Sequence, residues 1–116
     1  MEKEKSVYLE LFGDYPINRV LSFLIVNEDF DYSMAEIAKY SGVGYSTLKL
    51  FWPYLVESRV VIQTRGVGNA KMCKLNLQNP VVKKFRDFYW AVTKQHVHAE
   101  LEKEGLIPMA KVSVRK

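Results

Sequence analysis

Apolar side chains recur every three or four positions in several stretches of the chain, which is the spacing of one face of an α-helix. The clearest stretch follows Pro16, and its apolar positions are Ile17, Val20, Leu21, Leu24 and Ile25. Pro16 suits the first turn of a helix, because its missing N–H would have no partner there in any case. The preceding segment SVYLELFGD is also predicted to be a short helix, ending near Gly13.

A second pair of helices is predicted around a tight turn at Gly42. In SMAEIAKYSG, Ser33 and Glu36 have the spacing of a capping box, in which each side chain satisfies a free backbone N–H at the helix start. Gly42 ends this helix because glycine adopts a left-handed conformation at little cost. The next helix is expected to begin at about Tyr45.

That next helix is predicted within the stretch GVGYSTLKLFWPYLVES, and Pro53 lies in its middle, on its outer face. A proline there removes one backbone hydrogen bond and its ring crowds the preceding turn. We expect the segment to remain helical with a bend, because apolar side chains are predicted to be buried on both sides of the proline: Leu48, Trp52 and Leu55.

The pattern then changes from helical to extended. RVVIQTR and AKMCKLN are predicted strands, and GVGN between them is a turn signal, so the two form a β-hairpin. Asn79 and Pro80 are typical of an N-cap and a first helical residue. A long helix is therefore expected to run from there to about Glu104, where Gly105 stops it.

This order of elements is the layout of a winged helix-turn-helix. EIAKYSGVGYSTL resembles the helix-turn-helix core of the winged-helix transcription regulators common in archaea, related to the MarR and ArsR groups, and LVESRVVIQTRGVGNAKMCKLNLQNPVV resembles their wing and exit helix. The resemblance covers roughly residues 14–85. It implies a regulator that binds double-stranded DNA, with a repressor as the default.

The fold class is thus mainly α with a small β-hairpin, a winged helix-turn-helix plus a long C-terminal helix. Residues 1–79 are predicted to form the DNA-binding domain, 80–105 the long helix, and 106–116 a tail.

The placement of charge agrees with a polyanionic partner. The formal net charge is +4, but residues 1–44 carry 4 basic and 8 acidic groups, giving −4, and the remaining residues carry 13 and 5, giving +8. A basic second half suits DNA, although an unevenly charged solvated surface is the alternative. The hydrophobic content of 48% is enough for one compact core.

The single cysteine, Cys73, excludes an internal disulfide and favours a reducing cytoplasm. The N-terminal MEKEKS is not typical of a signal peptide, and the longest apolar run, VLSFLIV, is too short to cross a bilayer. We therefore expect a soluble cytoplasmic protein with no membrane partner.

The predicted recognition helix, residues 45–58, would enter the major groove of DNA. Tyr45, Ser46 and Lys49 are expected on its outward side, where Tyr45 and Ser46 would contact phosphates or base edges and Lys49 a phosphate or a guanine. Lys49 is the only basic residue of this helix. The alternative is that Tyr45 and Ser46 are ordinary residues of a first turn.

The predicted wing, residues 65–71, would contact the adjacent backbone or the minor groove. Arg65 and Lys71 flank its tip, which includes Asn69. Arg65 is the favoured contact, because the glycines of GVGN let the tip approach a DNA backbone closely. The alternative is that these cations only protect a sheet edge from pairing with another chain.

The long helix is predicted to span about 25 residues, or roughly 37 Å, which is more than a small winged-helix core can cover. Its apolar stripe is expected to form a homodimer interface that includes Phe85, Phe88, Tyr89, Val92 and His96. The alternative is that the helix folds back over the first helix of its own chain and leaves a monomer.

No motif indicates metal, cofactor or enzymatic chemistry. His96 and Glu100 share a helix face, but the chain has no CxxC or HExxH pattern, no phosphate loop and no nucleophile elbow. The remaining alternative function is a winged helix that binds a protein through the apolar face of LFWPYL.

Overall fold

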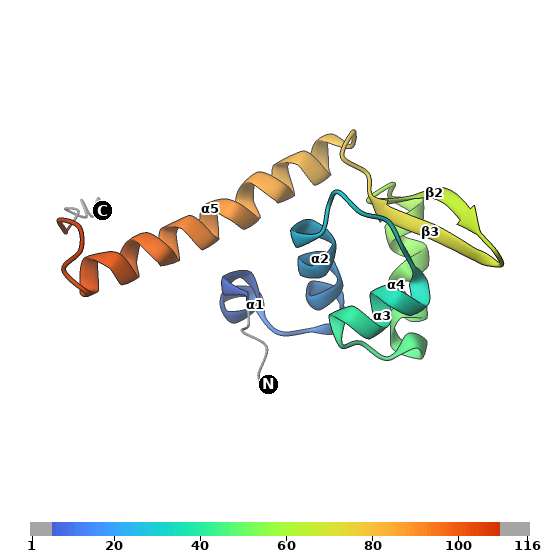
Figure 1. The fold of residues 1–116 in the computed structure, drawn as a ribbon, viewed down its shortest axis with the longest axis horizontal. Helices are drawn as coiled ribbons and strands as arrows, with labels where there is room; N and C mark the ends of the chain where they lie inside the picture. The colour runs from blue at the N-terminus through green and yellow to red at the C-terminus, as the bar shows by residue number, and fades with distance from the viewer. Residues whose placement is uncertain (1–5, 110–116) are drawn as a thin grey trace.

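The structure is a computed structural model that describes residues 6–109. It is mostly helical, with a small antiparallel sheet of three strands and a long C-terminal helix. The elements in chain order are α1 (Val7–Phe12), α2 (Pro16–Val26), β1 (Tyr32–Ser33), α3 (Met34–Ser41), α4 (Tyr45–Glu57), β2 (Val61–Val67), β3 (Ala70–Leu75) and α5 (Pro80–Lys103) (Figure 1). The predicted helices and hairpin are confirmed, and β1 is an addition to them.

The helix ends have the local causes that the sequence indicated. Ser33 and Glu36 form the complete capping box at the start of α3, and Gly42 follows the helix in the left-handed conformation with φ 70°. Asn79 caps α5, where its side chain accepts a hydrogen bond of 2.9 Å from the Val81 N–H.

The strands pair in the order β1-β3-β2. Gly68, with φ 60°, makes the tight turn of the β2–β3 hairpin, across which Val67 pairs with Ala70. On the other side of β3, Tyr32 pairs with Cys73 and extends the hairpin to three strands. The sequence did not indicate β1, because a strand of two residues leaves no alternating pattern.

The core surrounds α2, which lies between α5 on one side and α3 and α4 on the other (Figure 1). Its buried side chains Val20 and Leu24 belong to the same apolar cluster as Leu48 of α4 and Val82 and Tyr89 of α5. The predicted boundary at residue 79 therefore does not separate two packed units, because the first half of α5 completes this core.

Aromatic packing attaches α1 to α5. The Tyr8 ring lies 5.3 Å from the Tyr89 ring and 5.5 Å from the Phe85 ring, measured between centroids. The hydroxyl groups of Ser22 and Tyr89 share a buried hydrogen bond of 2.7 Å. Beyond these contacts the second half of α5 extends past α1 (Figure 1).

Candidate nucleic-acid interface

Helix α4 is held by one buried face. Leu48, Trp52 and Leu55 are 0 to 7% exposed, and burial of a leucine-sized side chain stabilises a fold by about 1.5–3 kcal/mol. The helix continues through Pro53, as predicted, and Pro53 lies on the exposed side. The bend that we expect at Pro53 stays a prediction.

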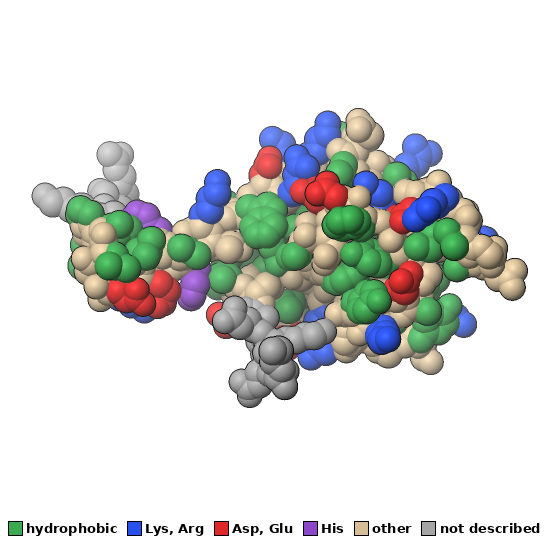
Figure 2. All heavy atoms as spheres, viewed as in Figure 1, with side chains coloured by type: hydrophobic (Ala, Val, Ile, Leu, Met, Phe, Trp, Pro, Cys, Tyr) green, Lys and Arg blue, Asp and Glu red, His purple; other side chains and the backbone are tan. Residues whose placement is uncertain are grey.

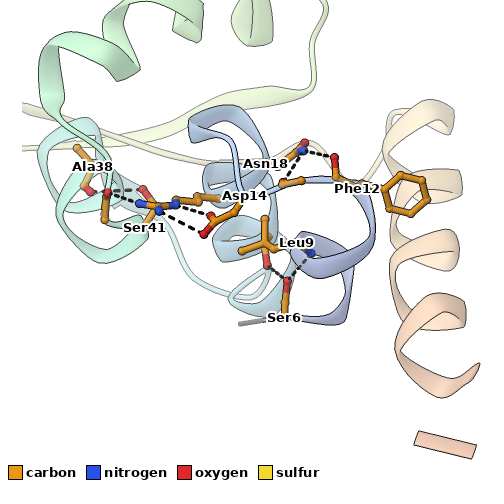
Figure 3. Close-up of polar contacts among 11 residues, drawn as sticks. Ser6, Leu9, Phe12, Asp14, Asn18, Ala38 and Ser41 are labelled. Atoms are coloured by element: carbon orange, nitrogen blue, oxygen red, sulfur yellow. Dashed lines mark hydrogen bonds and ion pairs between the residues drawn. The ribbon is translucent and has the colours of Figure 1, made fainter. Parts of the chain in front are cut away.

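The turn before α4 is fixed by an arginine from α2. The Arg19 guanidinium donates to the Asp14 carboxylate, with Nε 2.5 Å from Oδ1, and to the Gly42 carbonyl at 3.0 Å. Figure 3 shows Asp14 beside α2 and Ser41 at the end of α3, with contacts running between the two segments. Val43 is buried in the same turn, so the start of α4 has a defined direction relative to α2.

The three residues predicted to contact DNA from this helix share its outward side. Tyr45 is 48% exposed, and Ser46 and Lys49 are exposed as well. The Lys49 ammonium lies 5.6 Å from the centre of the Tyr45 ring, within the range of a cation–π contact. Gly44 is the N-cap and provides no side-chain hydrogen bond, so the first-turn N–H groups can donate hydrogen bonds to an anionic partner.

Leu50 and Tyr54 lie on the same side and belong to the LFWPYL stretch, whose apolar face the sequence offers as a protein-binding surface and not as a DNA contact. Leu50 is 81% exposed and Tyr54 is 76% exposed, the first being the most exposed of the large hydrophobic side chains in residues 6–109. Leu50 follows Ser46 by four positions and therefore shares its helix face. The outward face of α4 is thus more apolar than basic.

The Arg65 guanidinium on the hairpin forms an ion pair with Asp31. Its Nε and Nη2 lie 2.9 Å and 3.1 Å from the two carboxylate oxygens of Asp31, and Thr64 donates its hydroxyl hydrogen to the same carboxylate. A β-bulge brings Thr64 and Arg65 to Asp31 together: Gln63 pairs with Cys73 and Arg65 with Met72, so that Thr64 is the extra residue in β2.

The ion pair between Arg65 and Asp31 lowers the net positive charge of the hairpin near Arg65. The hydrogen bonds from Arg65, and then from Thr64, lower the pKa of the Asp31 carboxyl to about 2. At neutral pH Asp31 is therefore ionised and neutralises Arg65 locally. A DNA phosphate that contacts Arg65 would have to share the guanidinium with Asp31.

The tip of the hairpin keeps its polar groups exposed. Asn69 and Lys71 are both exposed, and Lys71 has no ion-pair partner in the part of the chain that the structure describes. Figure 2 shows Lys and Arg side chains gathered along the hairpin and over the start of α5. Of the wing residues predicted from the sequence, Lys71 is the cation that is available to a phosphate.

The basic residues near the start of α5 divide into two kinds. Lys83 and Lys84 are exposed, whereas Arg86 forms an ion pair with Glu28 at 3.1 Å. Arg59 lies at the end of α4, before the hairpin, and adopts a positive φ of 59°. The side-chain amides of Asn76 and Asn79 donate to the Arg59 carbonyl, which ties the end of α4 to the start of α5.

The predicted dimer interface needs a correction. Tyr89 is 1% exposed and Val92 is 9% exposed, and Phe85 packs against the core. These three side chains face the inside of their own chain, because α1 and α2 cover the first half of α5. Phe88, 44% exposed, and His96 remain on the surface.

No group of three or more His, Cys, Asp or Glu side chains within residues 6–109 could hold a metal ion. His98 instead pairs with Glu102 at 2.9 Å on α5. Burial raises the pKa of the Cys73 thiol, which makes the reactive thiolate scarce.

No helix in the described part of the chain is both long and apolar enough to cross a membrane.

Comparison of the chain with protein-family models, with curated proteins and with solved structures finds no match. Its function must therefore be inferred from its own residues and their arrangement.

Proposed function

We propose that this chain is a winged helix-turn-helix protein that binds double-stranded DNA and regulates transcription, with repression as the default. The observation that carries the proposal is the sequence α3, glycine turn, α4 and hairpin, in which the outward side of α4 is left uncovered. A helix presented in this way fits the major groove of B-DNA, and the hairpin beside it reaches the backbone.

The charges agree with this arrangement. Lys49 on α4 and Lys71 at the hairpin tip are exposed cations, and each phosphate contact by such a cation releases counterions and makes binding dependent on salt. Few side chains are placed to read bases, so backbone contacts supply much of the affinity. The proposed protein is a binding module without a cofactor, not an enzyme.

The direct test is selection of bound duplexes from a random pool, followed by affinity measurements at several salt concentrations. Lys49→Ala should relax the sequence preference. Lys71→Ala should lower the affinity for all duplexes equally, and it should reduce the slope of log affinity against log salt concentration by about one. Glu57→Gln, an exposed position at the far end of α4, is the matched control and should change neither. Failure to retain any duplex at low salt contradicts the proposal.

Arg65 needs its own control. Arg65→Ala also leaves the Asp31 carboxylate without its main partner, which adds a negative charge beside the proposed DNA path. We therefore compare Arg65→Ala with the double variant that also carries Asp31→Asn. If Arg65 contacts phosphate, both variants should bind weakly. If Arg65 acts only by neutralising Asp31, the double variant should recover the wild-type affinity.

We also propose that the second half of α5 pairs with a second copy of the chain. A groove of about 350 Å³ lies between α1 and α5, and its lining mixes apolar residues with polar ones: Val7, Leu11, Val92 and Ala99 with Glu10, Gln95 and His96. Val97 beyond it is 50% exposed. A dimer would present two α4 helices to half-sites about one DNA turn apart. Ala99→Glu should leave a monomer by sedimentation, and a wild-type mass of one chain at micromolar concentration would contradict this pairing.

A second candidate function is favoured by one observation. Leu50 and Tyr54 make the outer face of α4 apolar, which suits a protein-binding module as well as a DNA-binding one. The salt dependence of duplex retention separates the two, because an apolar protein interface has no counterions to release.

A further inference from the structure

Leu50 is placed where a DNA-binding helix normally carries a polar or basic side chain. Along α4, Ser46 and Lys49 are three positions apart, as are Leu50 and Pro53, while Ser46 and Leu50 are four apart, as are Lys49 and Pro53, and all four residues are exposed. These positions form one stripe on the outward side of the helix. Leu50, 81% exposed, leaves nearly all of its apolar surface in water in the free chain.

We infer that Leu50 determines sequence specificity by packing against the C5-methyl group of thymine in the major groove. This inference rests on the proposed function and names the sequence class that the site prefers. The thymine methyl is the apolar group that a base pair presents in the major groove, and leucine has no polar atom with which to read any other base edge. A site contacted by α4 therefore contains thymine opposite Leu50.

The surroundings of Leu50 favour DNA over an apolar protein partner. Lys49 is its immediate neighbour in the stripe and holds its ammonium group over the Tyr45 ring, so a protein that covered Leu50 would also have to cover a positive charge. DNA satisfies both side chains at once, because the phosphate backbone borders the groove that contains the methyl groups. The charge of Lys49 and the apolar side chain of Leu50 thus both favour DNA as the partner.

Pro53 limits the length of the stripe. Pro53 has no N–H and removes one backbone hydrogen bond of the preceding turn, so the part of the stripe before the expected bend is Ser46 to Leu50. Tyr54 lies beyond Pro53 on the next turn. Leu50 is therefore the last side chain of the stripe before the expected bend, and Tyr54, an exposed apolar residue one turn later on the same side, is the matched comparison after it.

The experiment replaces thymine by deoxyuridine, which pairs in the same way but lacks the C5-methyl group. Each thymine of a selected duplex is replaced in turn, and the dissociation constant is measured for the wild type, Leu50→Ala, Leu50→Met and Tyr54→Ala. For the wild type, one or two positions should lose about fourfold in affinity, the change expected when one methyl group leaves an apolar contact. Leu50→Ala should bind thymine and deoxyuridine duplexes equally, whereas Leu50→Met and Tyr54→Ala should keep the difference.

The outcomes distinguish a missing thymine contact from a failure of DNA binding. If duplexes bind but no deoxyuridine substitution matters, or if Leu50→Ala keeps the full fourfold difference, this inference is overturned and the proposed DNA binding stands. If no duplex binds and Leu50→Ala instead abolishes self-association of the chain, the apolar face belongs to a protein contact and both are overturned. Because Leu50 is exposed, its variants should fold, which circular dichroism checks.

Discussion

Replacement of Pro53 by alanine should stabilise the protein. The proline is exposed and therefore contributes little apolar packing that could be lost. Alanine restores an N–H that can donate to the Lys49 carbonyl, and a net hydrogen bond contributes about 1 kcal/mol. The full difference between proline and alanine inside a helix is about 3 kcal/mol, which sets the upper limit.

Two effects reduce the gain. The backbone of α4 has already adjusted to the proline ring, and alanine gives the unfolded chain more freedom, which costs about 0.4–1 kcal/mol. We expect a net gain of about 1–2 kcal/mol in the free energy of unfolding, or a rise in Tm of roughly 5–10 °C for a domain of this size.

Urea denaturation followed by circular dichroism measures this change. Tyr54→Ala, a neighbouring exposed position, is the control and should change the free energy of unfolding by less than about 0.5 kcal/mol. A loss of more than 1 kcal/mol in Pro53→Ala would refute the reasoning, because it would mean that the proline fits its turn without strain. If the bend also directs the first half of α4 into DNA, the stabilised variant should bind duplexes more weakly.

Further predictions concern contacts away from α4. Ser22→Ala leaves the buried Tyr89 hydroxyl without its partner and should lower the free energy of unfolding by about 1–3 kcal/mol. Tyr89→Phe should lower it less, because the Ser22 hydroxyl keeps its hydrogen bond of 3.2 Å to the Ser6 hydroxyl. Equal losses in the two denaturation curves would contradict this. The Asp31 carboxyl has a pKa of about 2 in the folded chain and about 4 when unfolded, so its stabilising contribution is complete above pH 4 and is lost as the pH falls through 2. Urea midpoints should therefore drop less over this window in Asp31→Asn than in the wild type, and parallel pH profiles would argue against the pair. Asn79→Ala removes the α5 cap together with two bonds to the end of α4, and should cost about 2 kcal/mol by the same assay, more than a cap alone.

The local part of the fold could be predicted from the sequence. The capping box at Ser33, the left-handed Gly42 and the Asn79–Pro80 helix start depend on residues within four positions of each other, so the sequence carries their complete cause. The hairpin was predicted for the same reason, because its turn and strands are adjacent in the chain.

The contacts that alter the candidate site join distant residues. Arg65 and Asp31 are 34 positions apart, and they meet where β1 joins the sheet and a bulge shifts the register of β2. A free arginine on the wing was therefore a reasonable prediction from the sequence, but the structure places a carboxylate beside it. Tyr89 and Val92 were assigned to a dimer for a similar reason, since the apolar stripe does not tell whether α1 or another chain covers it.

The exposure of Leu50 shows a different limit. The sequence assigns Ser46 and Lys49 to DNA contact and Leu50 to an alternative protein-binding face, although the helical spacing places all three on one side. Chemical type alone assigns a leucine to the core, and only the burial of Leu48 and Trp52 on the opposite side shows where Leu50 lies.

The hydrogen bond between Ser22 and Tyr89 also has a consequence for the order of events during synthesis. Its two residues are 67 positions apart, and at about 5–20 residues per second the ribosome needs roughly 3–13 s to add the second after the first. During that interval α3, α4 and the hairpin can close with their neighbours in sequence, but the face of α2 that receives α5 has nothing to cover it. The nascent chain therefore carries an open apolar surface until its last long helix emerges, and this is the stage at which a chaperone would bind it.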